Sequence, residues 1–400
     1  MQDTFIIDGL RTAIGSFRGS LSSVRTDDLA AHVIAALMQR YPDLDPAAID
    51  DVIMGCANQA GEDNRNVARM ALLLAGLPVT VPGETVNRLC ASGMSAVIHA
   101  HRAVQSGDGD LFIAGGVENM TRGPWVISKS DQPFGSNIEM HDSSFGWRFV
   151  NPRMKSLFGT DAMGETAENL AEMYNISRED QDLFAFHSQQ KAGASADFRS
   201  REITPVYIPR KKQDPLVIDT DEFIKSQTTT TGLAALRPAF REGGTVTAGN
   251  SSGLNDGAAA ILIASDFSVR QHHLKPMARI ISSAVVGVEP RIMGIGPVGA
   301  SQRALKKAGL ALDDMDVIEI NEAFAAQVLA CTRMLGIDDH DPRLNMHGGA
   351  IALGHPLGMS GARLINTAAR SLQLLNKKYA LVTMCIGVGQ GYAVVLEKVG

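Results

Sequence analysis

The sequence pattern around one cysteine suits a nucleophile. Cys90 lies where a β-rich stretch ends and an Ala-rich helical pattern begins, so its sulfur is expected to face the positive end of a helix dipole. That position predicts a cysteine whose thiolate form is favoured. Cys385 opens a second motif, Cys385–Gly391, in which glycine recurs at every second position. Cys56 and Cys331 are predicted to be small buried side chains, because the wide spacing of the four cysteines argues against a zinc site and a disulfide framework.

An internal repeat places a histidine opposite Cys90. Two three-residue blocks recur at one constant offset: Gly-Met-Ser at 93–95 and 358–360, and Asp-Val-Ile at 51–53 and 316–318. Two independent blocks in one register indicate a duplicated domain. In that register His355 corresponds to Cys90. We therefore predict that His355 is the base that serves the Cys90 thiol.

Short apolar runs alternate with helical patterns, the arrangement of an α/β protein. The predicted strands are 5–7, 52–55, 111–115, 280–286, 317–320, 381–386 and 392–396. The predicted helices are 26–39, 64–74, 92–105, 301–308, 323–335 and 360–374. Residues 121–243 are richer in polar and turn residues, but one helical piece over 165–194 favours a folded insertion over a disordered linker.

The composition excludes several classes of partner. The net charge is −6 and no basic block is present, which argues against nucleic acid as the main partner. The N-terminus has no cationic leader and no apolar run is long enough to span a bilayer, so we expect a cytoplasmic protein without a membrane partner. The segment Gly387–Gly391 lacks the G-x-G-x-x-G spacing and precedes a strand pattern, which argues against a dinucleotide site.

Six motifs, in order and over essentially the whole chain, resemble those of the thiolase family. They are residues 87–93, 115–120, 247–258, 321–324, 354–358 and 385–391. The resemblance implies an α/β fold with duplicated βαβαβαββ core domains, layered α-β-α-β-α, and an inserted loop domain. We expect the first core half at 1–120, completed by 244–274, and the second at 275–400. The loop domain, 121–243, is expected to cover the site for coenzyme A (CoA).

The resemblance also implies catalytic roles. Cys90 would be the acylated nucleophile, His355 the base that takes its proton, and Cys385 the second acid/base. Asn321 would hold a water that, with His355, binds the thioester oxygen of the acetyl-CoA enolate. The backbone N–H groups of Cys90 and Gly387 would bind the tetrahedral oxyanion.

Acyl-CoA and CoA are the implied partners, with CoA as a co-substrate, no tightly bound cofactor and no metal. Ser252 and Gly253 match positions that contact the pantetheine arm, Ala248 belongs to the same motif, and Met163 lies in the segment that resembles the substrate-pocket loop. Lys225 stands where thiolases often place an arginine against the adenine, and lysine lacks the flat guanidinium for stacking.

Three further segments, 61–69, 146–152 and 290–297, most resemble the 3-oxoadipyl-CoA thiolases of aromatic-compound catabolism. The implied reaction converts 3-oxoadipyl-CoA and CoA to succinyl-CoA and acetyl-CoA, in a homotetramer. Arg148 is our candidate for binding the distal carboxylate, because it lies between two aromatic residues in one of these segments and arginine can hold a carboxylate through two parallel hydrogen bonds. Gly164 departs from this group, in which proline is common, and predicts a more mobile loop.

Other functions remain open on this reasoning. An acetyl-CoA C-acetyltransferase that accepts acetoacetyl-CoA or broader chain lengths is the main alternative. A decarboxylating ketoacyl synthase shares the fold, but Cys385 favours a thiolase. A catalytically silent acyl-CoA-binding protein is disfavoured because the four residues with implied catalytic roles are all present: Cys90, Asn321, His355 and Cys385.

Overall fold

Most strands of this chain form one hydrogen-bonded sheet that divides into two halves. The computed structural model describes residues 2–400, in which the sheet order is β12-β13-β14-β11-β1-β10-β5-β3-β4. The strands are β1 (Thr4–Arg11), β3 (Asp51–Gly55), β4 (Gly83–Val86), β5 (Leu111–Asn119), β10 (Asn255–Ser265), β11 (Ala278–Gly287), β12 (Val317–Ile320), β13 (Tyr379–Ile386) and β14 (Gln390–Lys398). Only two residue pairs, Phe5 with Arg279 and Ile6 with Ala278, join β1 to β11. Each side of that short junction therefore behaves as a half-sheet.

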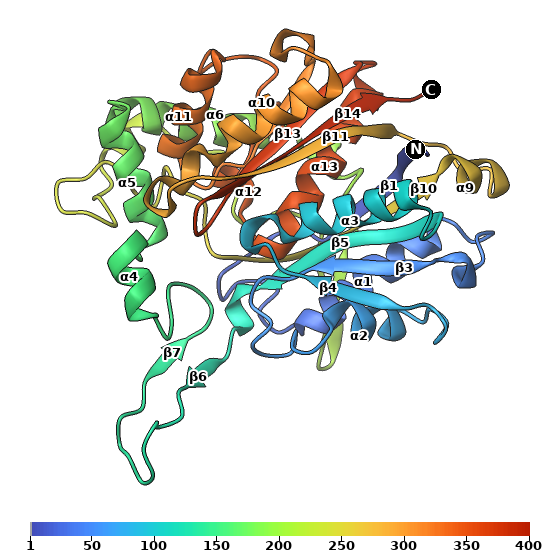
Figure 1. Ribbon diagram of the computed structural model, residues 1–400, viewed down its shortest axis with the longest axis horizontal. Helices are drawn as coiled ribbons and strands as arrows, with labels where there is room; N and C mark the ends of the chain where they lie inside the picture. The colour runs from blue at the N-terminus through green and yellow to red at the C-terminus, as the bar shows by residue number, and fades with distance from the viewer. Residues whose placement is uncertain (1) are drawn as a thin grey trace.

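Helices cover both outer faces of the half-sheets and fill the space between them. They are α1 (Thr26–Gln39), α2 (Val67–Leu74), α3 (Ser92–Ser106), α10 (Gly296–Ala308), α11 (Ala325–Leu335) and α13 (Leu357–Leu374). In Figure 1, α1 and α2 lie below the β10-β5-β3-β4 side, while α10 and α11 lie above the β13-β14-β11 side. Helix α13 packs against α3 and against strands of both halves, which is why nearly every residue of α13 is buried. The resulting α-β-α-β-α layering confirms the predicted fold class.

The long segment between β5 and β10 forms secondary structure of its own. It contains β6 (Trp125–Ile127), β7 (Met140–Asp142), α4 (Pro152–Phe158), α5 (Met163–Met173), α6 (Arg178–Ala194), α7 (Ala196–Arg199), β8 (Val206–Arg210), β9 (Gln213–Ile218) and α8 (Thr230–Ala234). Its strands pair only as the hairpins β6-β7 and β8-β9 within the described chain. The β6-β7 hairpin projects far from the body (Figure 1).

The prediction of a single helix over 165–194 was wrong, because this stretch forms two helices. Helix α5 ends at Met173, and Asn175 adopts a left-handed φ of 51°. Helix α6 then starts afresh, with the Ser177 hydroxyl accepting a hydrogen bond from the backbone N–H of Asp180. The break lets α5 and α6 take different directions.

A buried ion-pair cluster anchors the inserted segment to the core. Arg11, at the end of β1, donates from Nε to Glu202 at 2.7 Å and from Nη1 and Nη2 to Asp221 at 2.6 and 2.9 Å. The Arg11 side chain is fully buried. Removing one partner of such a cluster leaves an uncompensated charge, so the contact fixes the insertion firmly.

No helix within residues 2–400 combines the length and the apolar composition needed to cross a bilayer.

Candidate active site

Cys90 lies in a tight turn directly before α3. The turn is a 3-10 helix, Leu89–Ala91, and Leu89 has a φ of 48°, which is uncommon for a residue other than glycine. Asn87 holds this conformation, because its Oδ1 accepts from the Leu89 N–H at 2.9 Å. Ser92 closes the turn by donating to the Leu89 carbonyl at 2.7 Å. The turn leaves Cys90 partly exposed as a residue, while the surrounding protein still desolvates its sulfur.

Two backbone N–H groups meet at the Cys90 sulfur. One is the N–H of Cys90 itself, and the other is that of Gly387, in the turn between β13 and β14. The next residue, Val388, has a φ of 63°, a strained value for a β-branched side chain. The two donors that were predicted to form the oxyanion hole therefore converge at the predicted nucleophile.

Burial affects the pKa of the Cys90 thiol more strongly than these two donors do. It raises the pKa of the Cys90 thiol above its usual value, while the N–H groups of Gly387 and Cys90 lower it by less and the Glu118 carboxylate adds to the rise. The expectation that the helix start favours the thiolate is therefore wrong. Cys90 is a thiol at neutral pH and requires a base.

His355 is held in the orientation and tautomer that a base requires. Its backbone N–H donates to Oδ1 of Asn255 at 2.9 Å, and its Nδ1 lies 2.6 Å from Oγ of Ser360. Because Ser360 donates its own proton to the Pro356 carbonyl at 2.8 Å, Nδ1 of His355 carries the proton and Nε2 keeps its lone pair. Burial lowers the pKa of His355 to about 3, so the imidazole is neutral at pH 7.

Asn321 and Cys385 complete the group. Asn321 is fully buried, and its Nδ2 lies 3.4 Å from Nε2 of His355. Cys385, at the end of β13, is 1% exposed and packs with Met293 and Phe324. Burial and the adjacent Cys90 raise the pKa of Cys385 well above its usual value, so it holds its proton. The N–H of Asn321 also donates to the Thr383 carbonyl at 3.0 Å, which ties the Asn321 and His355 pair to the strand that carries Cys385.

The paired helices α3 and α13 bring the two halves of the site together. A Cβ at Gly93, near the start of α3, would lie 2.5 Å from the carbonyl oxygen of Gly358, near the start of α13. Only glycine permits this approach. Since Cys90 precedes α3 and His355 precedes α13, the contact brings equivalent positions of the duplicated halves to one place.

Glu118 joins the loop after β3 to the start of α13. Its motif was recognised in the sequence, but no role was predicted for this residue. It is buried at the end of β5, and it accepts from the N–H groups of Ala57 and Asn58 at 3.0 Å each and from Gly358 at 2.9 Å. Burial raises its pKa to about 7. A buried acidic residue inside a glycine-rich strand motif was the available signal. Asn255 and Ser360, which orient His355, were not assigned a role, although Asn255 lies in the 247–258 motif and Ser360 in the repeated Gly-Met-Ser block.

The sulfur of Cys56 and one carboxylate oxygen each of Asp63 and Glu118 lie within 4.8 Å of one another, a spacing that could suit a metal ion. Their contacts describe a hydrogen-bonded support: the Cys56 thiol donates to Asp63 at 3.8 Å, and Asp63 also accepts from the Gly61 N–H at 2.9 Å. Such protein donors already satisfy these carboxylates.

The predicted CoA-binding residues lie on loops beside this group. Ser252 donates its N–H to the Ala323 carbonyl at 2.9 Å, which ties its loop to the segment that carries Asn321. Gly253 lies against the ring of Phe223, and Nζ of Lys225 lies 5.2 Å from the centre of that ring. Ala248 and Lys225 are exposed. The structure thus brings Gly253 and Lys225 together through Phe223.

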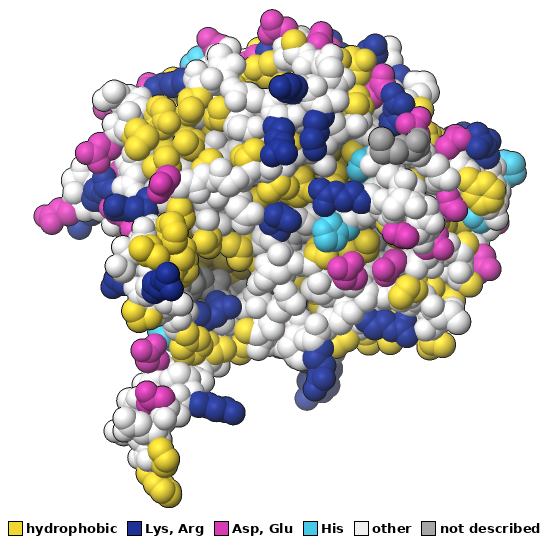
Figure 2. Space-filling model, in the orientation of Figure 1, with side chains coloured by type: hydrophobic (Ala, Val, Ile, Leu, Met, Phe, Trp, Pro, Cys, Tyr) yellow, Lys and Arg dark blue, Asp and Glu magenta, His cyan; other side chains and the backbone are white. Residues whose placement is uncertain are grey.

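A small opening adjoins the Gly387 turn. It is lined by Trp147, Phe158, Gly159, Asp161, Met163, Pro290, Arg291 and Val388, and we call it the side opening. A Cβ at Gly387 would lie 3.7 Å from Sδ of Met163. Figure 2 shows that this face is hollowed beside α4 and α5, with hydrophobic and basic side chains around the hollow. The predicted substrate-pocket residue Met163 therefore lies between the oxyanion donors and an exit to the surface.

Arg148 does not line the side opening. Its Nη1 donates to the Ser143 carbonyl and its Nη2 to Oδ1 of Asn58, both at 3.2 Å. Its role in binding a carboxylate stays a prediction.

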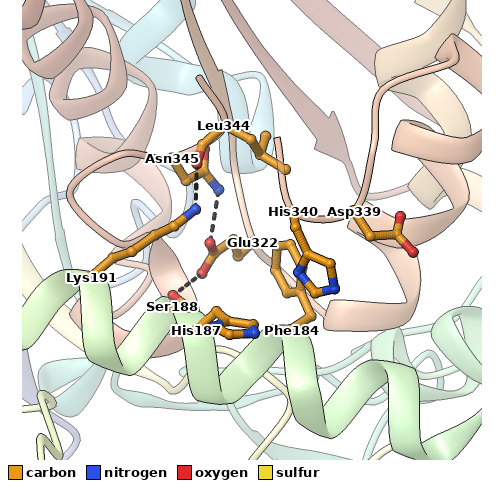
Figure 3. A pocket seen from close by; sticks show the side chains of 9 residues that line it. All are labelled: Phe184, His187, Ser188, Lys191, Glu322, Asp339, His340, Leu344 and Asn345. Atoms are coloured by element: carbon orange, nitrogen blue, oxygen red, sulfur yellow. Dashed lines mark hydrogen bonds between the residues drawn. The ribbon is translucent and has the colours of Figure 1, made fainter. Parts of the chain in front are cut away.

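A separate cavity of about 420 Å³ lies behind the Asn321 segment, between α6 and the 339–345 loop (Figure 3). Glu322 points toward it and accepts from Ser188 at 2.6 Å and from Asn345 at 2.8 Å. Lys191 donates to the Leu344 carbonyl at 2.8 Å. These contacts fix the residue next to Asn321, so we read the cavity wall as support for the site.

Comparison with known proteins identifies the family. Residues 4–266 match the thiolase N-terminal domain and residues 274–398 match the thiolase C-terminal domain. The chain belongs to the thiolase family. It is therefore an acyltransferase, an enzyme of a family that acts on acyl-CoA and CoA.

Relatives of this thiolase resemble it over their whole length. A β-ketoadipyl-CoA thiolase of Acinetobacter baylyi is 56% identical and a 3-oxoadipyl-CoA/3-oxo-5,6-dehydrosuberyl-CoA thiolase of Escherichia coli is 57% identical, each with complete coverage of both chains. The crystal structure of the Bacillus anthracis acetyl-CoA acetyltransferase superposes with a TM-score of 0.92 at 36% identity, covering 100% of this chain and 99% of that one.

Proposed function

We propose that this thiolase cleaves 3-oxoadipyl-CoA with CoA, giving succinyl-CoA and acetyl-CoA, in the degradation of aromatic compounds. The convergence of the Cys90 and Gly387 N–H groups at the Cys90 sulfur carries the mechanism. The choice of substrate is supported by the full-length relatives of that name at 56% and 57% identity, against 46% for a relative named acetyl-CoA acetyltransferase.

In the first half-reaction, Nε2 of His355 takes the Cys90 proton and the sulfur attacks C3, the ketone carbon. The oxyanion forms against the N–H groups of Cys90 and Gly387. The C2–C3 bond then breaks, and the electron pair leaves on the acetyl-CoA enolate, whose thioester oxygen lies by Asn321 and His355. Cys385 donates its proton to C2. Acetyl-CoA departs and the succinyl group stays on Cys90.

In the second half-reaction, the Cys385 thiolate takes the proton of the incoming CoA thiol. The CoA sulfur attacks the succinyl carbonyl, again with the oxyanion between the two N–H groups. The tetrahedral intermediate expels Cys90, which recovers its proton from the His355 imidazolium. Both thiols and the neutral imidazole are restored, so no cofactor beyond co-substrate CoA is required.

We also assign the loops at Ala248, Ser252, Gly253 and Lys225 to CoA binding, and we place the enzyme in the cytoplasm as a homotetramer. The four free cysteines suit a reducing compartment. The projecting β6-β7 hairpin exposes Trp125, Ile127 and Phe134, an apolar surface suited to burial against other subunits.

Steady-state thiolysis tests the substrate. We expect kcat/KM for 3-oxoadipyl-CoA to exceed that for acetoacetyl-CoA by at least about tenfold, because an added charge-assisted contact is worth that much. Equal or higher values for acetoacetyl-CoA would instead identify the enzyme as an acetyl-CoA C-acetyltransferase.

A further inference from the structure

We propose that Arg291, not Arg148, binds the distal carboxylate of the substrate from the wall of the side opening. This inference rests on the proposed function and adds a specificity-determining residue to it. Arg291 belongs to the 290–297 segment, and it lines the side opening together with Met163 and Val388. The Arg291 guanidinium and the turn that carries Gly387 therefore border the same opening.

Asp161 fixes the Arg291 side chain by one edge. Nε of Arg291 donates to Oδ2 of Asp161 at 2.9 Å, and Nδ2 of Asn169 donates to the same oxygen at 3.2 Å. Asn169 also donates to the Arg291 carbonyl at 3.0 Å, and Nε1 of Trp147 donates to the Asp161 carbonyl at 3.2 Å. The 146–152 and 290–297 segments thus meet at one aspartate.

This arrangement leaves the other edge of the guanidinium available. Nη1 and Nη2 of Arg291 have no hydrogen-bond partner among residues 2–400, and the side chain is 60% exposed. The pair of Nη groups is the fork that binds a carboxylate through two parallel hydrogen bonds. Fixing Nε in advance reduces the rotamer entropy that is lost on binding.

The chemistry of the substrate demands a cation close to the nucleophile. The carboxylate carbon lies only three carbon–carbon bonds from the ketone carbon that Cys90 attacks. The cation that binds this carboxylate must therefore come from a residue that lies next to the Gly387 turn. Among the residues that line the side opening, Arg291 is the one cation. Both Nη groups of Arg148 are already engaged with Ser143 and Asn58.

The test compares 3-oxoadipyl-CoA with 3-oxohexanoyl-CoA, which has the same chain length but a methyl group in place of the distal carboxylate. Both are assayed on the wild type, Arg291→Ala, Arg291→Lys, Arg148→Ala and Arg153→Ala. We expect Arg291→Ala to lower kcat/KM for 3-oxoadipyl-CoA by about 10- to 100-fold and to change that for 3-oxohexanoyl-CoA by less than about threefold. Arg291→Lys should recover part of the loss. Arg153, exposed on α4, provides a matched control that should behave as wild type.

Each outcome decides between the proposals. A wild type that does not prefer 3-oxoadipyl-CoA contradicts both the proposed function and carboxylate recognition at Arg291. A preference that survives Arg291→Ala, or is lost in Arg148→Ala instead, contradicts the Arg291 proposal alone. An equal loss on both substrates also overturns it, because Arg291 would then support the fold or CoA binding. Activity on 3-oxohexanoyl-CoA reports whether each variant is folded.

Discussion

The amide of Asn321 and the imidazole of His355 lie edge to edge, with 3.4 Å between Nδ2 and Nε2. Both are buried, and Oδ1 of Asn321 has no hydrogen-bond partner among residues 2–400. In a buried position such an acceptor is costly unless a water or ligand meets it. A water that donates one hydrogen to Oδ1 would direct its other hydrogen at the enolate oxygen, beside the proton that Nε2 of His355 takes from Cys90.

Replacing Asn321 with Ala should lower kcat for thiolysis by about 10²-fold, the usual effect of removing one oxyanion donor. The enolate forms before acetyl-CoA leaves, so acylation of Cys90 should slow to the same extent. Rapid-quench measurement of the first turnover checks this result. Unchanged acylation with slow release of succinyl-CoA would contradict the assignment.

The raised pKa of Cys90 predicts how the free thiol reacts. A raised pKa leaves less thiolate at neutral pH, so the rate of alkylation of Cys90 by iodoacetamide should increase with pH and reach its midpoint above the usual thiol value of about 8.5. Peptide mass spectrometry over a range of pH values measures this rate residue by residue. A plateau already reached below pH 7 would mean that the helix start, not burial, controls the thiol.

Cys385→Ala should still allow Cys90 to be acylated but should slow turnover by at least about 10²-fold, because a positioned acid/base contributes about 10² to 10⁴. Its raised pKa suits a proton donor to the enolate. Cys331→Ala removes another buried thiol and serves as the control. Near-normal turnover of Cys385→Ala would exclude the role.

Glu118→Gln should destabilise the protein by about 1–3 kcal/mol and lower kcat. Oε2 accepts from Ala57 and Gly358 and Oε1 accepts from Asn58, so an amide NH2 on either side would face an N–H donor. The temperature of thermal unfolding and kcat should both be lower than for Glu242→Gln, a control at an exposed position. A variant as stable and active as wild type would show that Glu118 does not position the His355 loop.

The sequence predicted those parts of the fold that have a strong period or motif. Helix α1 spans the predicted 26–39, and the predicted strands all fall within observed ones. The buried strand β10 was not singled out, because its run of small and apolar residues, NDGAAAILIAS, has no alternation. Its position became evident only from pairing with β1 and β5.

Residues whose importance lies in long-range contacts were the hardest to predict. Gly164 was read as a source of mobility, but a Cβ at this position would lie 2.1 Å from the ring of Phe240, far along the chain. Arg291 and Asp161 are likewise separated in sequence and joined only by the fold. The thiol pKa of Cys90 was misjudged for the same reason, since burial comes from the surrounding core rather than from the helix start.

Mass spectrometry of the acyl-enzyme tests the central claim most directly. The protein is exposed briefly to 3-oxoadipyl-CoA without free CoA, quenched in acid and digested. We predict a succinyl group on the peptide that contains Cys90, and its loss when CoA is added. A succinyl adduct on Cys385 alone, or acetyl-CoA release without any adduct on Cys90, would contradict the account.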